Sequence, residues 1–349
     1  MGYFHVMNLP IDERVEIGTF SGCFKHTSAT YKFYWLLALL EAVEEGKERI
    51  EKRELFARMV ANAWYTVQYF QVSFGKADSL EAAIGAIQEV EDIPLDASKA
   101  QIVDVLMRSD HRVTRRALKH FDGNVPHKFL SPWLGSGSKS EVYRLSQHGF
   151  GFPPYALYDD HVLVQPDWMN YFVRNAAVLK DYCRWNLAVF LQARNPNVPD
   201  MLGKLERPER RGSLARQKRD YWDLVIAELG GVKCIYTQRE LAKGEYDVEH
   251  FIPFQFLAHD QMWNLLPADP GFNSQKGDKL PLLTQHFKPF YATQMQAIRI
   301  IRAVKPKSGY LEDFLTVFRT LDISEQEYRN CVEPLLTIAH NNGFQYLRA

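Results

Sequence analysis

A carboxylate, an imidazole and an amide lie close together in the sequence YDVEHFIPFQFLAHDQMWNLLPADPGFNSQKGDKLP, which spans residues 246–281. Glu249 and His250 are adjacent, and Asn273 and Lys276 follow within the same segment. These residue types suit the hydrolysis of a phosphodiester. In that reaction one group deprotonates water, a hard cation neutralises the charge that develops at phosphorus, and a cationic side chain holds the phosphate. Mg²⁺ prefers oxygen ligands and keeps several waters, so one carboxylate and one amide oxygen are a sufficient contribution from the protein.

Two short strands and a helix are expected to position these side chains. Residues 246–251 are β-prone and place the acidic residue and the histidine at the end of a strand, and residues 264–266 form a second strand. A helix is expected to begin at Asn273 and to stop at Pro281. The order strand, strand, helix would bring the imidazole, the carboxylate and the amide to one place.

The motif resembles that of a known family. Six positions carry the likeness: Glu249, His250, Pro253, Asn264, Asn273 and Lys276. They resemble the HNH (ββα-metal) endonuclease motif, and they are especially similar to the HNH module of RNA-guided CRISPR effector nucleases. The resemblance covers about residues 230–285.

The resemblance implies a role for each residue. His250 would be the general base, and Glu249 and Asn273 would bind Mg²⁺ or Mn²⁺. Asn264 would brace the loop that holds the histidine, and Lys276 would contact a phosphate near the scissile bond. Glu249 departs from the pattern, which usually has aspartate here, and its extra methylene would shift the carboxylate by over an ångström unless the strand compensates.

Zinc is not expected to hold this module together. Many HNH proteins carry two CxxC pairs around the motif, whereas this chain keeps Cys234 and has Thr237 where a second thiolate would stand. The four cysteines are far apart, which favours a reducing, cytoplasmic setting and argues against a disulfide framework. We therefore expect no structural zinc, and packing against neighbouring elements must stabilise the module.

Composition restricts the class of protein. The 349 residues include 42 basic and 42 acidic side chains, so the formal net charge is zero and a uniformly basic wrapper of nucleic acid is excluded. No signal peptide is evident, and the longest apolar stretch, near residues 33–40, is too short to cross a bilayer. We expect a soluble protein without a membrane partner.

Helical patterns dominate the rest of the chain, and the expected fold class is mainly α. Residues 31–75, 79–93, 98–121 and 168–191 have helical patterns, with Ser98 as an N-cap, whereas residues 122–154 are rich in glycine, serine and proline and suggest a loop. The expected organisation has four parts. They are an α-rich recognition or regulatory region (1–200) with a small β-hairpin near 155–165, a basic linker or helix start (201–219), the HNH module (213–290) and a C-terminal helical packing element (291–349).

Basic residues concentrate just before the module. The candidates for nucleic-acid binding are Arg207, Arg210, Arg211, Arg216, Lys218 and Arg219. Such a run can follow a phosphate backbone with salt-dependent affinity that is blind to sequence. It can equally be a solvated linker.

These features lead to one preferred function. We expect a metal-dependent HNH endonuclease that hydrolyses DNA and nicks one strand per engagement. The resemblance suggests a setting in bacterial anti-phage or restriction defence, with protein partners of such a system. Two alternatives stay open: an HNH-fold protein that binds DNA or a partner without catalysis, and an RNA-cleaving HNH nuclease.

Overall fold

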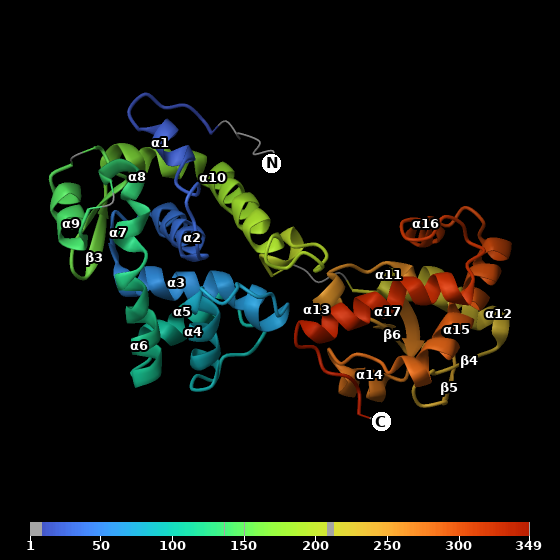
Figure 1. Ribbon diagram of the computed structural model, residues 1–349. Helices are drawn as coiled ribbons and strands as arrows, with labels where there is room; N and C mark the ends of the chain where they lie inside the picture. Colours follow the sequence, from blue (N-terminus) through green and yellow to red (C-terminus); the bar gives the residue numbers. More distant parts are fainter. Residues whose placement is uncertain (1–8, 136, 150, 208–212, 349) are drawn as a thin grey trace. The chain divides into compact units, whose positions relative to one another are not determined.

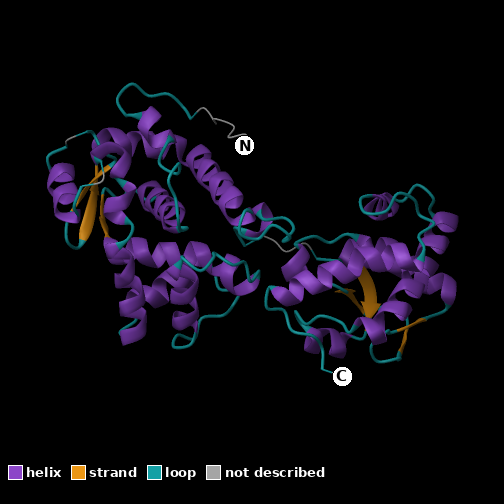
Figure 2. Cartoon of the chain, viewed as in Figure 1, coloured by secondary structure: helices purple, strands orange, loops and turns teal. Residues whose placement is uncertain are grey.

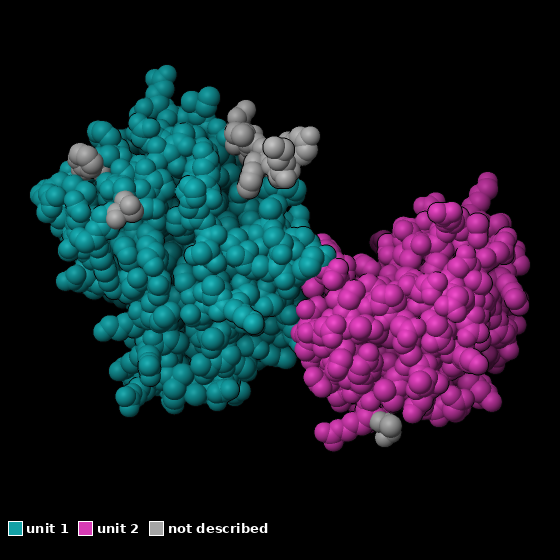
Figure 3. Space-filling view, viewed as in Figure 1, with its two compact units in different colours: residues 1–196, 201–207 teal, residues 197–200, 208–349 magenta. Residues whose placement is uncertain are grey.

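The computed structural model describes residues 9–135, 137–149, 151–207 and 213–348, and it divides into two compact units. Unit 1 contains Met1–Pro196 and Met201–Arg207, and unit 2 contains Asn197–Asp200 and Pro208–Ala349. Figure 3 colours the two units. Helices predominate in both, and the strands are short (Figure 2), so the expected mainly α fold class is confirmed.

Three long helices form the core of unit 1. Helix α2 (Tyr31–Glu44) is apolar almost all round, and residues 33–40 are all buried. It packs against α3 (Lys52–Trp64) and against α10 (Pro166–Gln192), which Figure 1 shows as the long helix of this unit. A helix without a polar face can be stable only where it is covered on all sides, and its two neighbours supply this cover together with Phe24, Phe74 and Tyr155.

The helices of unit 1 are shorter and more numerous than the sequence pattern predicts. The expected helical run 31–75 turns at Gly46, whose φ of +80° suits glycine, and then forms a short strand before α3. The expected helix 98–121 has a break after Arg108, although Ser98 does cap its first half, in a capping box with Gln101. The expected loop 122–154 contains three short helices: two of them have proline in the first turn, which tolerates it, and Ser138 caps the third.

A small antiparallel sheet completes unit 1. Strands β2 (Tyr155–Leu157) and β3 (His161–Val164) form a hairpin, and β1 (Arg49–Glu51) pairs with the other edge of β3 to give the order β1-β3-β2. The third strand comes from a segment that the sequence pattern assigns to a helix. The remaining helices of this unit are α1 (Ile17–Ser21), α4 (Ser79–Gln88), α5 (Lys99–Arg108), α6 (Arg112–His120), α7 (Pro126–Phe129), α8 (Ser131–Leu134) and α9 (Lys139–Gln147).

Unit 2 is built around a two-stranded antiparallel sheet and one short helix. Strand β6 (Asp247–His250) pairs with β7 (Leu265–Ala268), and α14 (Pro270–Lys276) packs on β6. The helix begins three residues before the expected Asn273, because Asp269 accepts hydrogen bonds from the backbone N–H groups of the first turn. The helix ends at Lys276, because the next residue, Gly277, adopts a φ of +54°. It therefore stops before the expected Pro281.

Helices and turns surround this ββα unit. They are α11 (Ala215–Gln217), the π-helical turn Lys218–Trp222, α12 (Asp223–Leu229), α13 (Phe254–Leu257), the 3₁₀ turn Met262–Asn264, α15 (Leu283–Val304), α16 (Glu312–Leu315) and α17 (Glu325–Asn341). A separate hairpin joins β4 (Val232–Lys233) to β5 (Glu240–Leu241). Figure 1 labels β6, α14, α15 and α17 in this unit.

The C-terminal helices form one core with the ββα unit. The rings of Phe251 and Phe290 stack at 3.9 Å, and Tyr328 meets Phe290 edge-on. The buried Gln294 amide of α15 donates hydrogen bonds to the carbonyls of Leu265 (2.7 Å) and Met262 (3.3 Å). Aromatic packing and these hydrogen bonds join α15 and α17 to the sheet.

Among the described residues, no helix combines the length and the apolar character that a membrane crossing demands.

Candidate functional site

Strand β6 and helix α14 carry Glu249, His250, Asn273 and Lys276 of the sequence motif, and Asn264 lies in the 3₁₀ turn before β7. Register across the antiparallel pair places Glu249 opposite Leu266 and His250 opposite Leu265. Alternate residues of a strand share a face, so Asp247 and Glu249 lie on the same side of β6, and both contact α14.

Glu249 and Lys276 form a buried ion pair. Glu249 Oε1 lies 2.5 Å from Lys276 Nζ, and Tyr236 donates its hydroxyl to Glu249 Oε2 at 3.0 Å. Burial raises the pKa of Glu249, and the lysine and the tyrosine partly offset this effect. Burial also raises the pKa of Tyr236 well above its ordinary value, and the neighbouring carboxylate adds to the increase. Lys276 additionally donates to the carbonyl of His250 at 2.9 Å, so its ammonium is turned inward.

His250 is paired with an aspartate that the motif does not include. Its Nε2 lies 2.8 Å from Oδ1 of Asp260, in the loop between the strands. A carboxylate oxygen accepts, so the contact is one in which Nε2–H donates to Asp260, and in a neutral imidazole of this tautomer the lone pair is on Nδ1. The neutral imidazole in this tautomer can take a proton from water.

Asn264 fixes the backbone next to the histidine. It is fully buried, its Oδ1 accepts from the N–H of Ile252 and its Nδ2 donates to the carbonyl of the same residue, both at 2.8 Å. The N–H of Phe251 donates to the Asn264 carbonyl at 2.8 Å. These bonds hold the backbone of the two residues that follow His250, and the bracing role that the resemblance implies for Asn264 stays a prediction.

Asn273 faces Asp247 rather than Glu249. Its Nδ2 lies 3.3 Å from Asp247 Oδ2, and both residues are partly exposed. Carboxylate and amide oxygens are the ligands that Mg²⁺ and Mn²⁺ prefer, so the donor set fits such a cation. Within the described residues, no group of three or more His, Cys, Asp or Glu side chains is arranged to hold a metal ion. A cation here would keep most of its waters.

Hydrogen bonds and stacking connect the loop between β4 and β5 to the start of α14. Asp269 pairs with Arg239 at 2.9 Å, and its backbone N–H lies 3.4 Å from the sulfur of the buried Cys234. Tyr236 stacks on Phe272 of α14 at 4.6 Å. These contacts tie the β4–β5 hairpin to the start of α14, while the expectation of a zinc-free protein stays a prediction.

The basic residues before the module differ in exposure and in their partners. Arg216 and Arg219 are exposed, and Arg219 pairs with Asp220 at 2.8 Å. Lys218 is turned to the module, where it donates to the carbonyl of Tyr246 and lies over the ring of the same residue.

The other members of the run lie elsewhere. Arg207 belongs to unit 1 and lies 3.6 Å from Asp96, whereas Arg210 and Arg211 fall outside the described residues. Arg216 and Arg219 are therefore the two candidates that the structure leaves accessible on unit 2.

Sequence reasoning misses Asp247 and Asp260, and it predicts Tyr236 as a packing residue without its hydrogen bond to Glu249. Asp247 has a signal, because it stands two residues before Glu249 in a predicted strand and so shares its face. The sequence gives no such signal for the contacts of Asp260 and Tyr236. These contacts depend on how the loop between β6 and β7 and the β4–β5 hairpin pack against the site.

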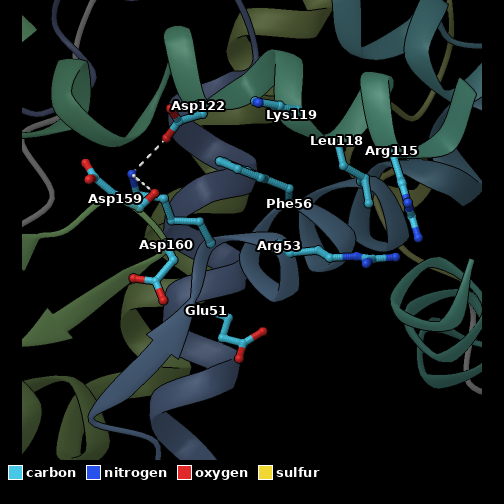
Figure 4. Close-up of a pocket in the computed structure, with 10 residues that line it drawn as sticks. Glu51, Arg53, Phe56, Arg115, Leu118, Lys119, Asp122, Asp159 and Asp160 are labelled. Carbon is cyan, nitrogen blue, oxygen red and sulfur yellow. Dashed lines mark hydrogen bonds and ion pairs between the residues drawn. The ribbon is translucent and has the colours of Figure 1, made fainter. Parts of the chain in front are cut away.

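A separate cavity of about 370 Å³ lies in unit 1. Figure 4 shows its acidic residues on one side, with Arg53, Arg115 and Lys119 on the other. The buried Lys52 ammonium donates to Asp122 Oδ1 at 2.8 Å and to the Tyr143 hydroxyl at 2.5 Å. Burial lowers the pKa of Lys52, although Asp122 opposes the shift. The lysine is fully engaged, so this network stabilises the packing of α3 rather than offering a free amine.

Comparison with known families identifies the module. A family model described as HNH endonuclease matches residues 234–282, which include β5, β6, β7 and α14. This segment is therefore similar to HNH endonuclease domains, and the resemblance to the HNH family seen in the sequence is confirmed at this level. A search of the curated proteins found no match, and a search of the solved structures found none either.

Proposed function

We propose that this protein is a metal-dependent HNH endonuclease that hydrolyses phosphodiester bonds of DNA. The observation that supports this most is the His250–Asp260 pair, which prepares an imidazole in the proton-accepting form at the end of β6, inside the segment that matches the family. The proposal includes the setting suggested by the resemblance, bacterial anti-phage or restriction defence, in which unit 1 serves recognition or regulation.

The proposed chemistry assigns a task to each residue. His250 Nδ1 takes a proton from the attacking water while Asp260 holds the ring. Asn264 keeps the following backbone in place, and Asn273 with a carboxylate of β6 would hold a divalent cation. When bound, the cation supplies positive charge against the charge that develops on the phosphate. Lys276 is buried beside Glu249, so we assign it to charge balance within the module instead of phosphate contact.

The test compares nucleic-acid cleavage by the wild-type chain and by His250→Ala. Supercoiled, linear and single-stranded DNA and a single-stranded RNA are incubated with Mg²⁺, with Mn²⁺ or with EDTA. We expect cleavage of DNA that requires metal, and a loss on the order of 10²–10⁴ in rate for His250→Ala.

Three outcomes would contradict the proposal. Equal rates for the two proteins would remove His250 from the mechanism. RNA cleavage alone would favour the ribonuclease alternative, and DNA binding without cleavage of any substrate would favour the non-catalytic HNH-fold protein. The melting temperature and the DNA affinity of His250→Ala, both expected to be close to wild type, serve as controls for folding and binding.

A further inference from the structure

A second cavity of unit 1 is lined by basic side chains without a carboxylate. It has a volume of about 590 Å³ and lies where the loop before α2 meets α7 and the starts of α4 and α8. Among the described residues, no aspartate or glutamate lines it. The basic groups are two lysines and three histidines: His26, Lys32, His120, His127 and Lys128. Such a lining favours an anion.

Lys32 is a half-buried cation without a counter-charge. It lies in the first turn of α2, its ammonium donates to the carbonyl of Cys23 at 3.2 Å, and it makes no ion pair with any described residue. Burial lowers the pKa of Lys32, and the opposing influence comes from the Cys23 thiol and not from a carboxylate. A charge that is partly withdrawn from water without a partner is unfavourable, so an anion in the cavity would supply what the protein lacks.

Acidic residues in the segments around the cavity are engaged elsewhere. Asp78 accepts hydrogen bonds from two backbone N–H groups, at 2.5 and 2.9 Å. Asp122 pairs with Lys52 at 2.8 Å and with Lys139 at 2.7 Å. Glu141 of α9 is exposed, so solvent and salt screen its charge. The cavity therefore keeps its positive character.

Two further observations agree with an anion site. Burial lowers the pKa of His127, and the charges of Lys128 and Lys139 lower it further, although Asp122 opposes the change. Helix α2 begins at this cavity, and the side chain of its N-cap, Thr30, makes no cap hydrogen bond. The aligned peptide dipoles of a helix place partial positive charge at its N-terminus, where anions are stabilised.

We propose that this cavity binds a small molecule that carries a phosphate group and has the size of a nucleotide. A phosphate monoester presents three strong acceptor oxygens and a charge of about −1.5 to −2, which matches donors that converge from several elements. The volume falls within the range of about 300–1,000 Å³ that small-molecule sites occupy, and phosphate alone would fill only a small part of it. Ala29, Tyr31 and Val142 offer apolar surface to the rest of the ligand. The inference concerns unit 1 alone and does not depend on the proposed nuclease activity.

Isothermal titration calorimetry of the full chain, in buffer with EDTA, tests the proposal. The probes are the four ribonucleoside monophosphates, inorganic phosphate, adenosine and a 5′-phosphorylated single-stranded oligonucleotide. We expect one equivalent of at least one nucleoside monophosphate to bind saturably, inorganic phosphate to bind more weakly, and adenosine not to bind.

Three variants connect this binding to the cavity. Lys32→Gln should weaken nucleotide affinity by at least about tenfold, because it removes a charged donor. Its melting temperature without ligand should not fall, since the substitution removes an unpaired cation. Lys128→Gln, at an exposed position, should fold normally and weaken affinity by at least about threefold. Lys180→Gln is the matched control, because Lys180 is a half-buried lysine of the same unit that has a partner, Glu44, at 2.9 Å, and it should leave affinity unchanged.

Four results would overturn the proposal. They are the absence of saturable binding by any of the monophosphates, affinities that Lys32→Gln and Lys128→Gln leave unchanged, binding of inorganic phosphate as tight as that of the nucleotides, and binding of adenosine as tight as that of its monophosphate. Binding of the oligonucleotide without binding of any monophosphate would also overturn it, and would make the cavity part of a surface for nucleic acid.

Discussion

At the scale of single residues, the position of His250 depends on three contacts that act on different atoms. Asp260 holds the ring nitrogen, Lys276 holds the carbonyl, and Asn264 holds the backbone of Ile252 two residues further on. General-base catalysis requires the ring to lie within hydrogen-bond reach of the water that it deprotonates. Small displacements of any of these contacts would therefore affect rate more than binding.

Asp260→Asn is expected to lower turnover through His250. The amide can present its NH₂ to Nε2, which favours the tautomer with the proton on Nδ1 and removes the lone pair that water needs. We expect single-turnover cleavage to fall by about tenfold to a hundredfold, with DNA affinity and Mn²⁺ affinity unchanged. A double-mutant cycle with His250→Ala is the decisive measurement, because Asp260→Asn should have no further effect once the imidazole is gone. Additive losses would assign Asp260 to another role.

Asn264→Ala is expected to destabilise unit 2 and to lower turnover together. The substitution leaves the N–H and the carbonyl of Ile252 without partners in a buried position, which costs about 2–4 kcal/mol of unfolding free energy. Chemical denaturation measures this loss, and Asn330→Ala, at an exposed position of α17, is the control. Mn²⁺ affinity should stay near wild type in conditions where the variant is folded. A stable variant with normal turnover would show that the brace is dispensable.

At the scale of elements, the nuclease module is not limited to the ββα segment. Helix α15 begins after the matched segment 234–282, yet its Gln294 satisfies two backbone carbonyls that flank Asn264. Tyr328 of α17 donates to the carbonyl of Trp263. A short sheet with two strands cannot bury enough apolar surface alone, so these helices complete its core.

Gln294→Leu is therefore expected to destabilise unit 2, although Gln294 lies outside the segment that matches the family. The two carbonyls of Leu265 and Met262 would lose their buried donor, at a cost of about 2–3 kcal/mol in the stability of unit 2. Gln296→Leu changes an exposed residue on the same helix and should leave stability close to wild type. Urea denaturation of both variants checks the expectation. Equal midpoints would mean that α15 contributes apolar packing only.

At the scale of the whole molecule, one HNH domain accompanies a larger helical unit that shares no motif with it. The family match covers one segment of the chain, and under the proposed function its single general base, His250, would hydrolyse one phosphodiester in each engagement. A cut through both strands requires a second module or a second encounter with the opposite strand. A symmetric dimer would be the simplest way to supply two modules.

Supercoiled plasmid is accordingly expected to become open-circle DNA first. Linear DNA should appear later and should depend more steeply on protein concentration, because it needs two independent events. Agarose gels of a time course over a range of protein concentrations distinguish the two products. Linear DNA without an open-circle precursor at the lowest protein concentration would instead indicate a dimer that cuts both strands together.

The sequence by itself determined the mainly α fold class and the position of the HNH segment. Glu249, His250, Asn264, Asn273 and Lys276 share one local pattern, and local spacing with strand and helix periodicity was enough to predict β6, β7 and α14. The same periodicity predicted a mainly α fold and a buried α2, because an apolar surface all round a helix has only one stable environment.

Only the tertiary structure decided which side chains meet. Asp260 reaches His250 from a loop, Tyr236 reaches Glu249 from a hairpin, and Lys276 turns inward to Glu249, leaving Asp247 to face Asn273. A sequence pattern encodes neighbours along one element, whereas these contacts join elements whose approach is set by packing of the whole unit. Burial is a property of that packing, and it separates the buried Glu249, paired with a lysine, from the partly exposed Asp247 two residues earlier.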